Sequence, residues 1–212
     1  MLTPVAIVLA VLGAAWGFVA DRIGARWPEH EDGHVRAIDW RTPVAIVTGG
    51  LALGALTLRY EDPVAAVAIG AYLVALVLLL ATDLDQRLLP DVITLPAIPL
   101  ALLFTLTGLN PMLSSASLPI AVVVAIVVPA GLALLAIPFG AGAIGMGDLK
   151  LLVSMGLLAG PMRLVIGVVY GAILAGVVIL VLLVARRITL KTYVPFGPFL
   201  IFGAMWAILV LR

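Results

Sequence analysis

Apolar runs long enough to cross a membrane recur along the whole chain of 212 residues, and short segments that carry the charges separate them. Hydrophobic residues make up 64% of the sequence and charged residues 11%, with a mean hydropathy of +1.29. A soluble domain is only about half apolar, and a spanning helix needs about 20 mainly apolar residues. The sequence therefore predicts an all-α, polytopic membrane protein.

Eight spanning helices fit this pattern. We expect them at residues 4–20, 42–58, 63–82, 91–107, 118–138, 148–159, 162–185 and 195–211. Pro63 stands at a favourable first helical position, and Gly160 with Pro161 predicts a turn. We treat 1–212 as one membrane-embedded domain, in which 1–58 forms an added helix pair with a short loop and 59–212 forms a six-helix core.

The distribution of Lys and Arg gives the orientation, because cytoplasmic loops of membrane proteins are enriched in cations. With the N-terminus outside, nine cations fall on the cytoplasmic side and three on the opposite side. The nine are Arg22, Arg26, Arg36, Arg41, Arg87, Lys150, Arg186, Arg187 and Lys191, and the three are Arg59, Arg163 and Arg212. This topology places Asp83, at the end of the third helix, and Asp148, at the start of the sixth, on the cytoplasmic face.

Ionisable residues at a membrane boundary are costly and are functional candidates by default. Asp83 and Asp148 could form an aspartyl dyad, in which one protonated carboxyl polarises a peptide carbonyl and one carboxylate takes a proton from water. Two ordinary acids that cap helix ends are the alternative. The dipole at a helix start favours an anion and the dipole at a helix end disfavours it, so we predict the charge on Asp148 and the proton on Asp83.

Neighbouring residues refine this hypothesis. Gly145 and Gly147 flank Met146 just before Asp148, and glycine permits unusual dihedrals or a close approach to a bound peptide. Asp85 lies two residues from Asp83 on a continuing helix, so we do not expect both to face Asp148. Lys150 is either a cytoplasmic anchor or a direct part of the site.

Three ordered motifs carry a specific resemblance. ATDLD at 81–85 is followed by Leu88, Leu89 and Pro90; GMGDLK occupies 145–150; and PFGP occupies 195–198 with Leu200 after it. The sequence resembles the bacterial type IV prepilin peptidases, which belong to the GxGD family of intramembrane aspartyl proteases. The resemblance implies that Asp83 and Asp148 are catalytic, and that the supporting or substrate-binding residues are Asp85, Pro90, Gly145, Gly147, Lys150, Pro195, Phe196, Gly197 and Pro198.

The resemblance also implies the reaction and its setting. The expected substrates are prepilins or pseudopilins, whose basic leader is removed just after a glycine at the cytoplasmic face of the inner membrane. Neither a cofactor nor a nucleic acid partner is expected. The rival interpretations are a proton-coupled transporter that uses Asp83 and Asp148 as a relay, and a non-enzymatic assembly protein of a pilus or secretion system.

The loop between the first two helices departs from the family pattern. Bifunctional members carry a larger domain there, with paired CxxC motifs for zinc, and that domain goes with N-methylation of the mature pilin. Here the loop is only residues 21–41 and the chain has no cysteine, so zinc bound by thiolates is excluded and methylation is doubtful. His30 and His34, with the acids at 29, 31 and 32, could form a substitute metal site, but we predict a solvated loop and no metal.

Overall fold

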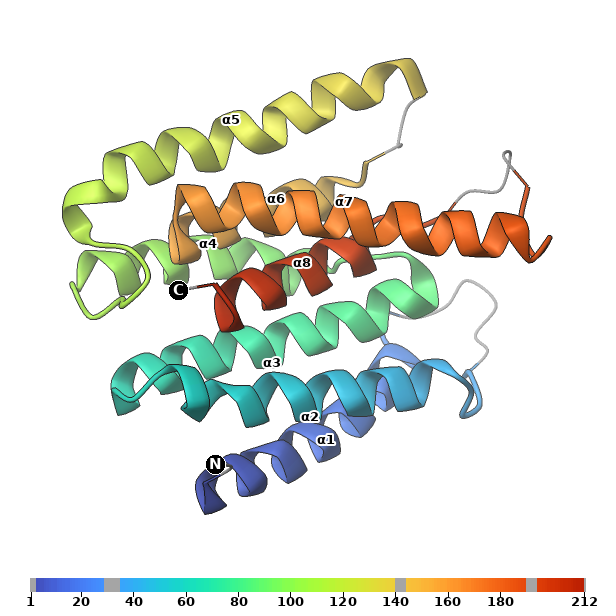
Figure 1. Cartoon of the computed structure of the whole chain (residues 1–212), viewed down its shortest axis with the longest axis horizontal. Coiled ribbons are helices and arrows are strands. Elements are labelled where there is room, and N and C mark those ends of the chain that lie inside the picture. The colour runs from blue at the N-terminus through green and yellow to red at the C-terminus, as the bar shows by residue number, and fades with distance from the viewer. Residues whose placement is uncertain (1–2, 29–34, 140–143, 190–193, 212) are drawn as a thin grey trace.

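The structure is a computed structural model that describes residues 3–28, 35–139, 144–189 and 194–211. Over these residues the chain forms eight α-helices and two short 3₁₀ helices, with no strand (Figure 1). The helices are α1 (Pro4–Gly24), α2 (Arg41–Arg59), α3 (Pro63–Gln86), α4 (Asp91–Leu106), α5 (Leu118–Ala136), α6 (Met146–Ala159), α7 (Pro161–Val184) and α8 (Gly197–Leu209). All eight predicted helices are present, so the all-α prediction is confirmed.

The helix starts have local causes. The side chain of Thr3 accepts a hydrogen bond from the backbone of Ala6 at the start of α1, and Asp62 does the same for Ala65 at the start of α3. Pro63 occupies the first turn of α3, as its position in the sequence predicts. The end of α3 differs from the prediction, because the helix continues past residue 82 to Gln86 and ends at Arg87 in the left-handed region.

Close packing of glycines joins α1 to α2. A Cβ added to Gly13 or Gly17 would collide with the backbone of α2, and one added to Gly49 would collide with the backbone of α1. Small residues that let helix backbones approach are typical of helix pairs in membranes, where the hydrophobic effect does not drive association. Gly167 of α7 and Gly203 of α8 make the same kind of contact.

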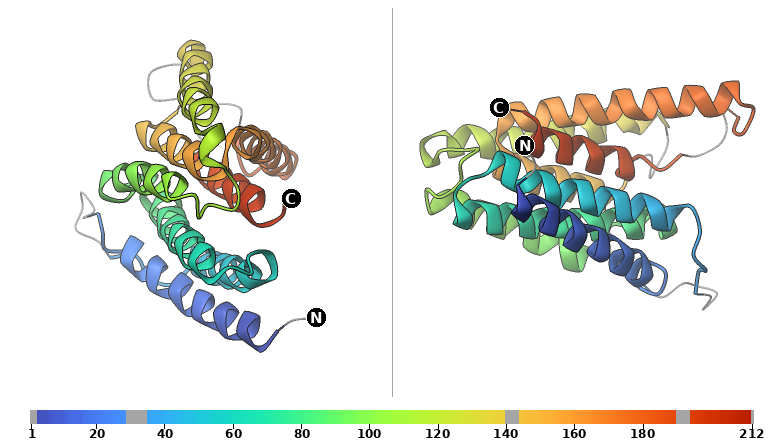
Figure 2. Two further views of the ribbon diagram at one scale, coloured as in Figure 1. Left: turned by 90° about the vertical axis from the view of Figure 1, so that its left-hand side faces the viewer. Right: turned by 60° about the horizontal axis from the view of Figure 1, so that its bottom comes forward.

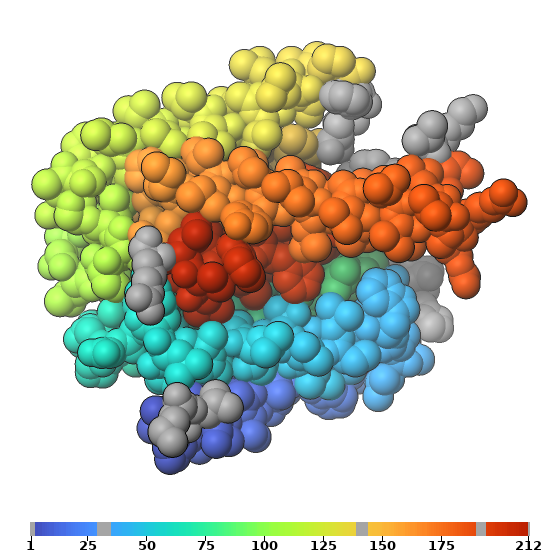
Figure 3. Space-filling view, viewed as in Figure 1, coloured from blue at the N-terminus to red at the C-terminus, as the bar shows by residue number. Residues whose placement is uncertain are grey.

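Helix α3 lies at the centre of the bundle. Its side chains Ile69, Leu73, Leu76 and Leu80 are fully buried and belong to one core with residues of α6 and α8. Figure 2 shows α1 and α5 at opposite edges of the molecule, and Figure 3 shows α8 between α7 and the α2–α3 layer. The core is therefore built where α3, α6 and α8 meet.

Five helical segments are long and apolar enough to cross a membrane: α1, α2, α3, the segment 115–136 that contains α5, and α7. Helices α4 and α8 are shorter apolar helices, and α6 has 14 residues. Consecutive helices alternate in direction, so the end of α3 and the starts of α4, α6 and α8 lie at the same end of the bundle (Figure 1). This end brings the three sequence motifs together.

Candidate active site

Asp83 lies in the last turn of α3. The backbone N–H of Arg87, whose φ of 56° ends the helix, donates to the carbonyl of Asp83 over 2.9 Å. The residue is only 5% exposed, and its Oδ2 is buried without a hydrogen-bond partner in the described part of the chain. An unpartnered buried carboxylate oxygen is costly and marks a functional candidate.

Asp148 lies in the first turn of α6, as the sequence predicts. It is 8% exposed, and its Oδ2 accepts a hydrogen bond from the backbone N–H of Gly145 over 3.3 Å. This contact satisfies one of the donors that a helix start leaves without an intrahelical partner. The backbone and the helix dipole therefore both favour a negative charge at this carboxyl.

Gly197, the first residue of α8, brings the two acids to one point. A Cβ added to this glycine would collide with Oδ2 of Asp83 and would lie 2.9 Å from Oδ1 of Asp148. Both carboxyl groups therefore point at the same small space in front of the Gly197 backbone, and a water molecule there could contact both. Gly197 and Pro198 are buried, with Pro195 and Phe196 just before them, so the third motif covers the two acids.

The other motif residues support the backbone around the acids. A Cβ on Gly147 would lie 2.6 Å from Cβ of Leu89, so this glycine lets α6 pack against the loop that follows α3. Pro90 is the N-cap of α4 at the end of that loop. Gly145 has ordinary extended dihedrals, with φ of −71° and ψ of 146°, so neither glycine takes the unusual backbone conformation that the sequence allows.

Two charged candidates point away from the acids. Asp85 lies 2.6 Å from Nε of Arg36 and accepts a hydrogen bond from Arg41 over 2.9 Å. The prediction that Asp83 and Asp85 do not share a face is therefore confirmed. Lys150 donates to Asp91 of α4 over 2.6 Å near the surface, which makes it a link between α4 and α6.

A buried ion cluster behind Asp85 was not anticipated from the sequence. Asp21 is 1% exposed and accepts hydrogen bonds from Arg22, Arg36 and Thr42. Burial works against the charge of Arg36, but its carboxylate partners, Asp21 foremost, outweigh burial and raise its pKa. The sequence holds one signal for this cluster, because Asp21 follows an apolar run and several arginines come after it. From the sequence, these arginines serve only to assign the orientation in the membrane.

The residues proposed as a substitute metal site, His30 and His34 with their acidic neighbours, lie outside the described residues. In the described ranges no group of three or more His, Asp or Glu side chains comes together as a metal site would require.

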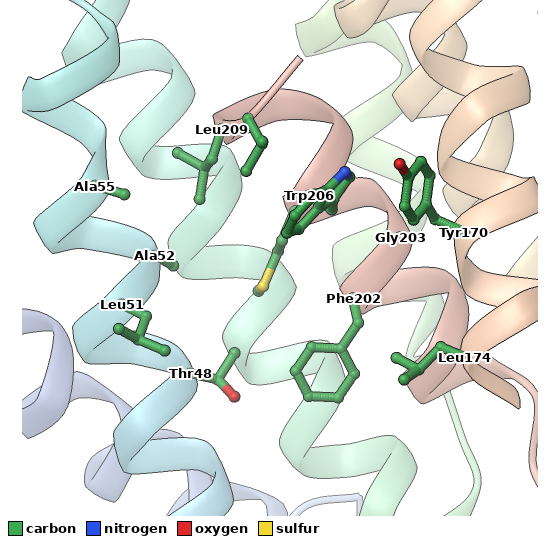
Figure 4. Close-up of a pocket in the computed structure, with 12 residues that line it drawn as sticks. Thr48, Leu51, Ala52, Ala55, Tyr170, Leu174, Phe202, Gly203, Trp206 and Leu209 are labelled. Carbon is green, nitrogen blue, oxygen red and sulfur yellow. The ribbon is translucent and has the colours of Figure 1, made fainter. Parts of the chain in front are cut away.

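Two hollows flank α8. One of about 500 Å³ lies between α2, α7 and α8, where Figure 4 shows Leu51 and Ala52 opposite Phe202 and Trp206. No acid or histidine is among the described residues that line it. The other, of about 590 Å³, borders the end of α3 and has Asp85 and Pro198 in its wall. Of these two hollows, the second adjoins the site, because residues next to Asp83 and Gly197 in the sequence line it.

Comparisons with known proteins identify the family. Residues 69–181, just over half of the chain and including both Asp83 and Asp148, match the model of the type IV leader peptidase family. The chain is also 35% identical over 188 residues to proteins named prepilin leader peptidase/N-methyltransferase from Burkholderia pseudomallei strains 1026b and K96243. The match covers 85% of this chain and 53% of each relative, so the chain spans about half the length of these curated relatives.

No solved structure matches the chain significantly. The prepilin peptidase resemblance is nevertheless confirmed by the family match, which contains the motifs at 81–90 and 145–150, and the apolar helices make the chain an integral membrane protein. The chain belongs to the type IV leader peptidase family.

Proposed function

We propose that this protein is an intramembrane aspartyl endopeptidase that removes the leader from prepilins or pseudopilins. The observation that carries the proposal is the contact of Gly197 with both Asp83 and Asp148, because it requires the two carboxyl groups to share one space. Both are nearly inaccessible to solvent, and two carboxyl groups held this close do not both ionise readily. The names of the curated relatives agree with a leader peptidase.

The proposed chemistry needs only the two acids and a water molecule. The carboxylate takes a proton from the water, the water oxygen bonds to the scissile carbonyl carbon, and the protonated carboxyl donates a hydrogen bond to the carbonyl oxygen. As the C–N bond breaks, the carboxyl group that took the water proton gives it to the leaving amine nitrogen, and the tetrahedral intermediate collapses to the new carboxyl group of the leader. We assign the negative charge to Asp148, which accepts from Gly145 at a helix start, and the proton to Asp83 near a helix end.

We further propose eight membrane spans, an outside N-terminus and an acid pair at the cytoplasmic face of the inner membrane. The alternating helices and the nine-to-three distribution of cations support this orientation. Helices α6 and α8, with 14 and 13 residues, are about 20 Å long, which is shorter than a hydrocarbon core of about 30 Å. Both are mostly buried among longer helices, so they do not have to match the bilayer alone.

The proposal is limited to leader removal. The relatives are named for both peptidase and N-methyltransferase functions, whereas the loop at 21–41 in this chain has no cysteine to bind zinc through thiolates. The acids that we propose as catalytic lie in the segment that the family model matches.

The test is leader removal from a co-expressed prepilin. We expect cleavage by the wild-type chain, and no cleavage by Asp83→Asn or Asp148→Asn at equal amounts of membrane-inserted protein. Asp91→Asn is the matched control, because this acid lies at the same end of the bundle but is 60% exposed. If the protein were a transporter or an assembly protein, it would show no leader removal that depends on these acids.

The same assay run with a chelator tests the metal-free mechanism. We expect an unchanged rate, because the two acids supply all the proton transfers. Full cleavage by either Asn variant would refute the dyad, and loss of cleavage with chelator would refute the metal-free mechanism.

A further inference from the structure

The last turn of α3 carries acids on two faces. Asp83 points toward α6 and α8, whereas the side chain of Asp85 is 3% exposed and contacts Arg36 and Arg41. Arg41 donates a hydrogen bond to Oδ1 of Asp85, and Nε of Arg36 approaches the same oxygen as a charge contact without hydrogen-bond alignment. Ion pairs therefore hold the face of α3 that lies opposite the candidate site.

Arg36 connects this contact to α1. Its guanidinium lies 2.5 Å from Asp21 of α1, 2.6 Å from Asp39 of the loop and 2.6 Å from Asp85 of α3. Asp21 in turn accepts a hydrogen bond from Thr42 in the first turn of α2 over 2.7 Å. One polar cluster thus joins the end of α1, the α1–α2 loop, the start of α2 and the end of α3.

The end of α3 needs such support. Helix ends fray because their last carbonyls lack intrahelical partners, and Asp83 lies only three residues before the last residue of α3, Gln86. Asp148 is oriented by the N–H of Gly145, but Oδ2 of Asp83 has no hydrogen-bond partner in the described residues. The backbone must therefore set the position of Asp83. Gln86 makes a second connection between the end of α3 and the end of α1, because its side-chain amide donates hydrogen bonds to the carbonyls of Gly24 and Pro28.

General stability does not explain a buried cluster of this kind. Burying charges costs desolvation energy, and a buried ion pair is often no more stabilising than apolar residues of similar volume. In some proteins, buried charges with fixed hydrogen-bond geometry instead specify a single arrangement of the elements that they join.

We propose that Asp85, through Arg36 and Arg41, is a positioning residue that fixes the last turn of α3 and so holds the Asp83 carboxyl against Asp148. This role rests on the proposed function, since it concerns the geometry of the same dyad. Asp85 itself neither touches the substrate nor transfers a proton.

The test compares Asp85→Asn and Arg36→Gln with Asp39→Asn. Asp39 pairs with the same Arg36 at the same distance as Asp85 does, and it also contacts Arg41 at the start of α2, but it makes no link to α3 and is 33% exposed. Leader removal by purified protein is measured per folded molecule, with kcat and KM determined separately. We expect kcat to fall about 10- to 100-fold for Asp85→Asn and Arg36→Gln, with KM little changed, and both constants to stay near wild type for Asp39→Asn.

Two further readouts separate positioning from general loss of structure. Asp85→Asn and Arg36→Gln, when combined, should lower kcat by less than the product of their separate effects, because both variants remove the contact between Asp85 and Arg36. Amide hydrogen exchange should accelerate at residues 83–87 in Asp85→Asn and stay at the wild-type rate there in Asp39→Asn. The exchange measurement does not depend on activity, so it reports on the order of the last turn of α3 even where a variant is inactive.

The outcomes distinguish this role from the proposed function. If the wild type cleaves and Asp85→Asn keeps the wild-type kcat, the positioning role is overturned and the dyad is not. The same conclusion follows if hydrogen exchange at residues 83–87 is unaltered in Asp85→Asn. A rise in KM alone would make Asp85 a substrate contact and also overturns the role. A wild-type chain that leaves the prepilin uncut overturns the proposed function, and the positioning role falls with it.

Discussion

The substitution Gly197→Ala adds a single methyl group where the two acids meet. The new Cβ would collide with Oδ2 of Asp83 and lie 2.9 Å from Oδ1 of Asp148. Because Gly197 is a buried residue at the start of α8, held between α3 and α7, the backbone cannot swing the methyl group into open space. The change therefore acts on the space between the carboxyl groups.

The size of the effect follows from the overlap. Carbon and oxygen atoms need a separation of about 3.5 Å, so at least one carboxyl must move by the order of 1 Å. A displacement of about 1 Å in a catalytic constellation lowers the rate about 100-fold, which corresponds to about 2.7 kcal/mol of barrier. The methyl group also occupies the space that we propose for the attacking water, so the loss should appear in kcat.

The assay is the rate of prepilin leader removal, with thermal unfolding of the purified protein measured alongside. Two other glycines supply a graded comparison. A Cβ on Gly145 would lie 3.4 Å from Oδ2 of Asp148, which is ordinary contact, and a Cβ on Gly176 of α7 would meet nothing within 4 Å. We expect Gly145→Ala to lose less than tenfold and Gly176→Ala to keep the wild-type rate.

Either of two results would refute this reasoning. If Gly197→Ala cleaves at the wild-type rate, the two carboxyl groups do not use the space in front of Gly197. If Gly176→Ala slows cleavage as much as Gly197→Ala does, the effect comes from adding a methyl group anywhere in the bundle.

Three other predictions concern stability and the supporting contacts. Lys150→Gln should lower the stability by less than about 1 kcal/mol and change the cleavage rate less than threefold, because its pair with Asp91 is near the surface; a larger loss of rate would make Lys150 a direct part of the site. Gly49→Ala should lower the melting temperature, at a cost of about 1–3 kcal/mol, because the α1 backbone fills the space of the new methyl; Gly176→Ala, with open space, should not. Burial raises the pKa of Tyr60, so its stabilisation is present below the unfolded value of about 10 and is lost as the pH rises through the folded value. Melting curves at rising pH should show this alkaline loss in the wild type and a smaller one in Tyr60→Phe.

The helices could be predicted because their causes are local. Apolar runs set their number, and Asp62 with Pro63 sets the start of α3. The end of α3 could not be predicted in this way. Polar residues at 83–86 read as the end of a span, but Asp85 and Gln86 remain helical where their side chains meet partners on α1 and its loop. Those partners are more than forty residues away in sequence, so no local pattern reports them.

The candidate site could likewise be predicted from the sequence only in part. The motif spacing selects Asp83, Asp148 and Gly197, and the structure brings these three together. The spacing does not say why each glycine is there. Gly147 makes room for Leu89, and Gly197 makes room for the two carboxyl groups. Such reasons depend on which backbone lies opposite a given residue, and that is decided only by tertiary packing.

If Asp83 and Asp148 carry out the proposed hydrolysis, their position has to meet two opposed requirements. Two carboxyl groups share a proton most readily when they are shielded from water, yet the reaction consumes a water molecule. Asp83 lies one helical turn inside the end of α3, under the start of α8, and the hollow of about 590 Å³ borders that same end. A dyad deeper in α3 would be surrounded by the apolar core, and one beyond Arg87 would be solvated. The last turn of α3 would meet both requirements of the proposed reaction, and it is the same turn that we propose Asp85, Arg36 and Arg41 hold in place.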